Sequence, residues 1–281
     1  IQLMQGTSDK INVLVAGADG NLGSLIVKEL FNYPNITVFG LGKHMSQNQD
    51  ICDAIEEKGG KAYTVDIMDK AKLRDITKGI HTIVSAIEGD EDVIYRGQMD
   101  LLEDAIKNGV RRFVPANFTV EFEGLVKSDE PFLYSRQKFD DELRKSSVQG
   151  LFITTGMFMD TYLDMCTDGV SYWGNEDTTI DLIAREDAAK FIAAAVADPN
   201  RAGHLCVTGI SVKVKELPDL LEKVLEKRVE LIQYGGVEDL KKKANELKAK
   251  GDNIAAAKYF YAIHAFDGKG KITKSQNSEF P

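Results

Sequence analysis

The sequence predicts an α/β protein built on a doubly wound parallel sheet, with a smaller C-terminal α+β lobe. Through the first half of the chain, six short runs rich in Val, Ile and Leu alternate with amphipathic stretches. Parallel strands need crossover connections and bury both faces, so this alternation indicates a sheet covered by helices on both sides. The alternation breaks after residue 156. We therefore predict a main domain over residues 10–156 and a lobe over 157–281, whose strands can also join the main sheet.

The elements follow from apolar periodicity and from the turn residues between the runs. The predicted strands of the main sheet are 11–17, 36–42, 61–66, 80–87, 111–116 and 149–156, and the predicted helices between them are 21–33, 49–59, 70–79, 93–109 and 134–146. In the second half we expect two short strands around Trp173, a helix over 185–199 and a strand over 203–209. A helix over 214–228, a strand over 229–235 and two helices within 237–266 follow, and then a polar tail.

Composition excludes several classes of protein. The 281 residues carry 35 Lys and Arg against 44 Asp and Glu, a formal charge of -9, which opposes binding to nucleic acid or to an anionic membrane surface. No apolar run reaches the ~18 residues of a membrane helix. Cys52, Cys166 and Cys206 are far apart, with no CxxC pair. We therefore predict a cytoplasmic protein without a metal site.

The segment INVLVAGADGNLGSLIVKEL places Gly17, Gly20 and Gly23 between the first strand and the first helix. The first glycine permits a tight turn, the second lets the backbone approach a ligand, and the third lets the helix pack close to the strand. Amides at the start of such a helix bind a diphosphate. We predict a dinucleotide site of the Rossmann type that also includes Asp19, Asn21 and Leu22, although a glycine turn that merely packs remains the alternative.

The end of the second strand decides which dinucleotide fits. An acidic residue there would bind the ribose hydroxyls of NAD, whereas a cation would accept the extra phosphate of NADP. The sequence TVFGLGKHMSQ offers Lys43 and His44 and no acid before Asp50. This pattern favours NADP(H) over NAD(H). The alternative is that Lys43 is a solvated loop charge.

The ends of the third and fourth strands complete the predicted cofactor edge. Asp66 ends the third strand, and Ser85, Ala86 and Ile87 end the fourth, next to the switch point where ligands bind in such sheets. Small residues at the fourth strand let a cofactor lie flat. Asp66 alternatively caps the following helix, and the two roles are compatible.

The segments GADGNLG, VDIMD, RRFVPANF, YSRQKFDDELRKS and LIAREDAAKFIAAAVADPNRAGHLCVTG together resemble the NmrA-like and isoflavone-reductase-like group of atypical short-chain dehydrogenases. The resemblance covers roughly residues 11 to 234. It implies a domain that binds NADP(H) and a smaller lobe that closes over the substrate. The members are either reductases or redox-sensing regulators.

Carried over by position, the resemblance implies that Asp66 and Ile67 lie near the adenine, that Ala116 contacts the cofactor, and that Lys138 contacts the nicotinamide ribose. The chain departs from the group at three places. GLGKH stands where the group often has an arginine, residues 115–118 read PANF instead of PSEF, and residues 154–156 read TTG instead of RPG.

Tyr134 and Lys138 form a YxxxK pattern and share one face of the predicted helix. An ammonium beside a phenol stabilises the phenolate, which allows Tyr to give a proton to a carbonyl while hydride arrives from the nicotinamide. A Ser or Thr usually lies upstream in this superfamily, and the candidates are Thr119 and Ser128. In the isoflavone-reductase-like subset the lysine alone is thought to handle the proton, so Lys138 ranks above Tyr134. The alternative is a helix whose Tyr packs and whose Lys is solvated.

The sequence as a whole predicts an NADP(H)-dependent reductase of a small carbonyl or conjugated substrate. The segment MFMDTYLDM and Trp173 are candidates for an apolar substrate pocket, or else for core. The rival prediction is a non-catalytic NADP(H)-binding redox sensor of NmrA type, which acts through a protein partner. Because the Ser or Thr that would complete the Tyr134–Lys138 pair is not clearly present, both hypotheses stay open.

Overall fold

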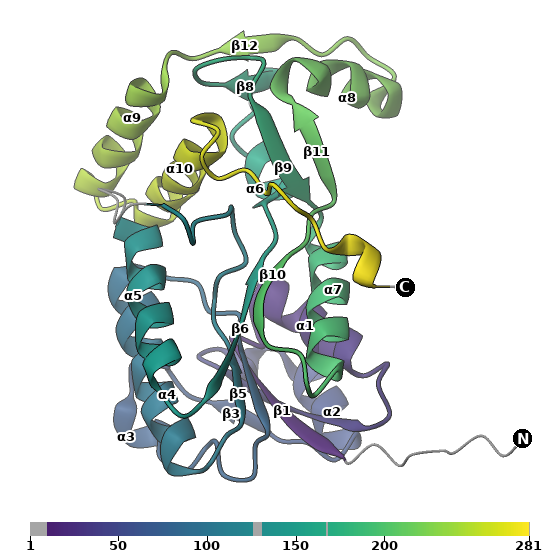
Figure 1. Ribbon diagram of the computed structural model, residues 1–281, viewed down its shortest axis with the longest axis vertical. Coiled ribbons are helices and arrows are strands. Elements are labelled where there is room, and N and C mark those ends of the chain that lie inside the picture. The colour runs from purple at the N-terminus through teal and green to yellow at the C-terminus, as the bar shows by residue number, and fades with distance from the viewer. Residues whose placement is uncertain (1–9, 126–130, 167, 281) are drawn as a thin grey trace, which may run out of the picture.

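The computed structural model describes residues 10–125, 131–166 and 168–280, and its centre is a seven-stranded parallel sheet (Figure 1). The strand order is β10-β6-β5-β4-β1-β2-β3. The strands are β1 (Ile11–Ala16), β2 (Ile36–Gly42), β3 (Ala62–Thr64), β4 (Thr82–Ser85), β5 (Arg112–Val114), β6 (Gln149–Thr154) and β10 (Gly203–Cys206). The prediction of a doubly wound parallel sheet is confirmed, because the order reverses direction at β1 and β4.

Helices cover both faces of this sheet. One face packs on α1 (Asn21–Leu30), α2 (Gln49–Glu57) and α7 (Arg185–Ala197), and the other packs on α3 (Lys70–Leu73), α4 (Gln98–Lys107) and α5 (Pro131–Lys145). Leu14 and Val15 are both fully buried and belong to the two different core clusters. Successive residues of a strand point to opposite faces, so a strand with helices on both sides is apolar throughout.

A second lobe lies beyond the sheet and has its own core (Figure 1). It contains a three-stranded sheet of β7 (Met157–Phe158), β9 (Thr179–Ile183) and β11 (Ile210–Lys213), and a pair of β8 (Val170–Tyr172) and β12 (Leu231–Gln233). Its helices are α6 (Met159–Leu163), α8 (Leu217–Leu225), α9 (Val237–Ala249) and α10 (Asn253–Phe266). Strand β10 pairs with β6, so part of the predicted lobe does join the main sheet.

Several elements differ from the sequence-based expectation, among them β7 and α6, which the sequence analysis did not predict. The third helix ends at Leu73, because Asp75 has a φ of 62° and turns the chain toward α4. There the buried carboxylate of Asp104 accepts hydrogen bonds from the Asp75 and Thr77 amides at 2.9 and 3.1 Å. Strand β11 was not predicted; it pairs antiparallel with β9 in the sheet of the second lobe. Among the described residues, no helix is both long and apolar enough to span a bilayer.

Candidate functional site

A cleft of about 900 Å³ runs along the carboxyl ends of the parallel strands and is lined on its other side by the second lobe. The sheet contributes residues from the glycine turn and from the ends of β2 to β5. The lobe contributes Met157, Phe158 and residues of α6 and α10. Of the residues predicted from sequence, those that line this cleft are Gly17, Asp19, Gly20, Asn21, Leu22, Lys43, Asp66, Ile67, Ala86, Ile87 and Ala116.

Neighbouring backbone atoms leave no room for a side chain at two glycines of the first turn. Gly17 has a φ of 82°, and a Cβ there would lie 2.5 Å from the carbonyl oxygen of Ala86. A Cβ on Gly23 would lie 1.9 Å from the carbonyl oxygen of Gly17. Both distances are far below van der Waals contact. Gly23 therefore lies beneath the turn rather than on the cleft wall, and it lets α1 approach the strand.

The N-terminus of α1 opens into the cleft. Gly20 is its N-cap residue, no side chain caps the helix, and its first turn contains no acidic residue. Gly20, Asn21 and Leu22 line the cleft. Unsatisfied amides and the positive end of the helix dipole attract an anion, so this turn fits a diphosphate.

One ion pair and one backbone hydrogen bond to a carboxylate lie at the end of β2. The Lys43 Nζ lies 2.8 Å from the Asp66 carboxylate. This hydrogen bond raises the pKa of Lys43 and, with the Met68 amide, lowers the pKa of Asp66. Asp19 accepts a hydrogen bond of 2.5 Å from the His44 amide. The predicted phosphate-binding cation is therefore paired with the Asp66 carboxylate, and a second carboxylate, Asp19, binds the backbone of the next residue.

The end of β4 is split between cleft and core. Ala86 and Ile87 line the cleft, and the Ala86 amide donates to the Ala16 carbonyl at 2.8 Å. Ser85 is completely buried, and its hydroxyl has no hydrogen-bond partner among the described residues. Ser85 thus contributes to the strand, and its two successors contribute to the cleft wall.

The YxxxK pair lies on one face of α5, as its spacing predicts, but neither side chain is among the cleft-lining residues. The Lys138 Nζ lies 4.0 Å from the ring centroid of Tyr95, in the π-helical turn Val93–Gly97, and 5.9 Å from the centroid of Tyr134. Of the upstream candidates, Thr119 lines the cleft and Ser128 lies outside the described residues. The lysine role therefore stays a prediction.

The same helix places a different cation in the cleft, which the sequence analysis missed. Arg136 is 6% exposed, and its Nε donates to the Ala116 carbonyl at 2.8 Å. Its Nη2 lies 3.0 Å from the hydroxyl of Tyr261 on α10, and its guanidinium lies 5.1 Å from the centre of that ring. Arg136 and Tyr261 both line the cleft. Nothing in the spacing of the sequence joins two residues 125 positions apart.

The buried polar side chains of Asn117 and Asp140 support the position of Arg136. The Asn117 side chain donates to the Asp140 carboxylate at 2.7 Å. Burial, partly offset by this hydrogen bond, raises the pKa of Asp140 to about 7. Asp140 is one turn along α5 from Arg136, and Asn117 follows Ala116. The pair therefore joins the two segments between which the Arg136 guanidinium is held.

The apolar pocket residues divide between cleft and core. Met157 and Phe158 line the cleft. Trp173 packs instead among Tyr234, Tyr259 and Phe266, with centroid distances of 5.6 to 5.9 Å, and belongs to the core of the lobe.

The parallel sheet, its reversal at β1 and β4 and the glycine turn define a Rossmann-type fold. The model of the NmrA-like family matches residues 9–279, so the chain belongs to that family. A search of curated protein sequences gave no significant match.

Solved structures share the fold over nearly the whole chain. Isoflavone reductase is 16% identical, with a TM-score of 0.77 over 95% of this chain and 91% of that chain. The structure "AtPrR2 with NADP+ and (+)pinoresinol" is 19% identical, with a TM-score of 0.75 over 96% and 92%. The triphenylmethane reductase of Citrobacter sp., complexed with NADP(H), is 15% identical, with a TM-score of 0.71 over 94% and 93%. The cofactor in the last two is the one that the sequence predicts.

Proposed function

We propose that this protein is an NADP(H)-dependent reductase of a small carbonyl or conjugated substrate. The observation that carries the proposal is that one cleft contains both the uncapped glycine turn and the Arg136–Tyr261 pair. The first feature suits a dinucleotide and the second suits a polar group of a substrate. Two structural neighbours that are named as reductases, isoflavone reductase and triphenylmethane reductase, support the same class of reaction.

The residues of the sheet edge would hold the cofactor. The amides of Asn21 and Leu22 would bind the diphosphate, Gly17 and Gly20 would form the turn that holds those amides in place, and Lys43 would donate to the 2′-phosphate of the adenosine. Asp66 and Ile67 would lie near the adenine, as the family resemblance implies. The bound NADPH would supply the hydride.

Tyr261 is our proposed proton donor. Its hydroxyl is in the cleft, and its oxygen accepts a hydrogen bond from Arg136. A guanidinium cannot itself give up a proton at neutral pH, so the role of Arg136 is to hold the phenol and to stabilise negative charge that develops on a substrate oxygen. Met157 and Phe158 would exclude water from the reacting groups.

The second candidate function is a redox sensor that binds NADP(H) without turnover and acts through a protein partner. One observation favours it: the ammonium of Lys138, which the sequence assigns to proton transfer, lies over the ring of Tyr95. If Tyr261 is not a proton donor either, the cleft would bind the cofactor without a group that completes the reduction.

Steady-state oxidation of NADPH with a panel of aldehydes, ketones and enones separates the two functions. The reductase hypothesis predicts turnover in the wild type and, in Tyr261→Phe, a fall in kcat of about 100-fold with unchanged NADPH affinity. Tyr234→Phe is the matched control, because that tyrosine is exposed, stacks on Trp173 and does not line the cleft. Lys138→Ala, measured in parallel, tests the sequence-based assignment.

Tight NADPH binding without turnover of any substrate would contradict the reductase and support the sensor. Turnover that survives in Tyr261→Phe but is lost in Lys138→Ala would move the acid role back to Lys138.

A further inference from the structure

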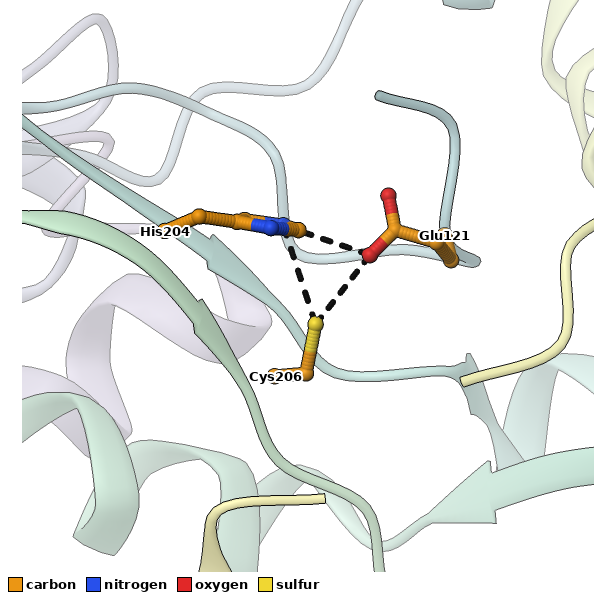
Figure 2. Close-up of side chains that lie close together, drawn as sticks. All are labelled: Glu121, His204 and Cys206. Atoms are coloured by element: carbon orange, nitrogen blue, oxygen red, sulfur yellow. Dashed lines mark hydrogen bonds and ion pairs between the residues drawn. The ribbon is translucent and has the colours of Figure 1, made fainter. Parts of the chain in front are cut away.

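A cluster of three potential metal ligands lies outside the cleft, at the edge of the main sheet (Figure 2). His204 and Cys206 are two residues apart on the edge strand β10, so their side chains share one face. Glu121 reaches them from the segment that follows β5. None of the three lines the cofactor cleft.

We propose that Glu121, His204 and Cys206 bind one zinc-type divalent cation. The Glu121 carboxylate oxygen Oε2 lies 3.2 Å from His204 Nε2 and 3.1 Å from Cys206 Sγ, and Cys206 Sγ lies 3.7 Å from His204 Nε2. Tetrahedral zinc with ordinary bond lengths would separate N from O by about 3.3 Å, and sulfur from either by about 3.6 Å. The three atoms already form a triangle of nearly this size.

Neighbouring groups orient two of the ligands. The Nδ1 of His204 lies 2.8 Å from the Glu123 carboxylate, which leaves Nε2 facing the cluster. A ligating histidine commonly donates its second ring N–H to a carboxylate in this way. The Glu123 amide donates to Glu121 Oε1 at 2.8 Å, which leaves Oε2 for the cation. Thr154 Oγ1, 3.1 Å from His204 Nε2, also faces the cluster.

The donor set favours zinc over the common hard cations. A thiolate and an imidazole suit Zn²⁺ and related transition metals, whereas Mg²⁺ and Ca²⁺ prefer oxygen ligands. Side-chain exposure is 28% for His204 and 19% for Glu121, so an ion can enter and a water can complete the tetrahedron. Binding would replace the thiol proton of Cys206 and release it to solvent.

The site would join β10 to the segment that leads into the cleft. Phe118 and Thr119, which line the cleft, precede Glu121 by only three and two residues. A bound ion would thus fix the far end of this segment. The proposal does not depend on any catalytic activity.

The test is titration of the full-length protein with Zn²⁺ against a chromogenic chelator, together with Co²⁺ absorption spectra. We expect one equivalent bound, a thiolate-to-cobalt charge-transfer band, and a rise in Tm with Zn²⁺. Cys206→Ser and His204→Gln should each weaken binding by at least about 100-fold, and Glu123→Gln by about tenfold. Cys166→Ser is the matched control and should bind as the wild type does, because Cys166 lies in the other lobe.

Circular dichroism of each variant without metal shows whether it is folded, and the conservative Cys206→Ser keeps the volume of the side chain. Three results would overturn the proposal: binding weaker than millimolar, a cobalt complex without the thiolate band, or equal affinity in wild type and Cys206→Ser. In the last two cases the cluster would be only an ion-pair network of His204 with Glu121 and Glu123.

Discussion

The two halves of the cleft are built in different ways. The glycine-turn half is local, since Gly17, Gly20 and Gly23 lie within one strand–helix corner and constrain one another through the backbone. The other half brings Arg136 of α5 to Tyr261 of α10, from positions 125 residues apart. Steric requirements define the first half, and the packing of one lobe against the other defines the second. The first half should therefore respond to added volume and the second to changes in buried charge.

The largest expected effect concerns the buried carboxyl of Asp140, which supports the Arg136–Tyr261 half of the cleft. The pKa of Asp140 is about 7 in the folded protein against 3.8 for an ordinary aspartate, so the folded state holds this proton between about pH 4 and pH 7 while the unfolded chain does not. The stability that Asp140 contributes is present below pH 4 and is lost as the pH rises through 7. Asp140→Asn should abolish this loss, which amounts to about 4 kcal/mol at most.

Urea unfolding of both proteins from pH 4 to pH 8 measures the difference. Asp141→Asn is the control, because Asp141 is exposed on the same helix. If the free energy of unfolding depended on pH equally in the wild type and in Asp140→Asn, Asp140 would not be the group that holds a proton in the folded protein, and the prediction would be wrong.

The next effect concerns the local half. Gly23→Ala would place a Cβ 1.9 Å from the Gly17 carbonyl oxygen and force the turn away from α1. NADPH binding, measured by calorimetry, should weaken by at least about 100-fold, or ~2.7 kcal/mol. Gly124→Ala, where a Cβ meets no atom within 4 Å, should bind normally. Wild-type affinity in Gly23→Ala would mean that this turn does not hold the cofactor.

The smallest expected effect concerns the preference for NADPH over NADH, which depends on charges near the glycine turn. Asp19 accepts the His44 amide beside Lys43, where its negative charge would oppose a phosphate. Asp19→Asn keeps an oxygen for that hydrogen bond and removes the charge. The affinity ratio of NADPH to NADH should rise about tenfold. Lys43→Met should lower the ratio, and a ratio indifferent to both changes would remove Lys43 from the phosphate site.

The same comparison explains what the sequence could and could not predict. Strands β1 and β2 were recognisable because buried parallel strands are apolar throughout, and Gly17 because only glycine fits its turn. Arg136 and Tyr261 look like ordinary helix residues until α5 and α10 pack together. Likewise His204 and Cys206 show no metal-binding pattern until Glu121 meets them across the sheet edge. Asp75, which ends α3, depends on the distant Asp104 for its turn.

The most direct test of the central claim, that both halves form one site, is a crystal structure of the protein with NADP⁺. We predict diphosphate oxygens at about 3 Å from the amides of Asn21 and Leu22, and the nicotinamide on the side of the cleft that Ala116, Arg136 and Tyr261 line. A dinucleotide bound elsewhere, or a nicotinamide turned away from Tyr261, would contradict the account.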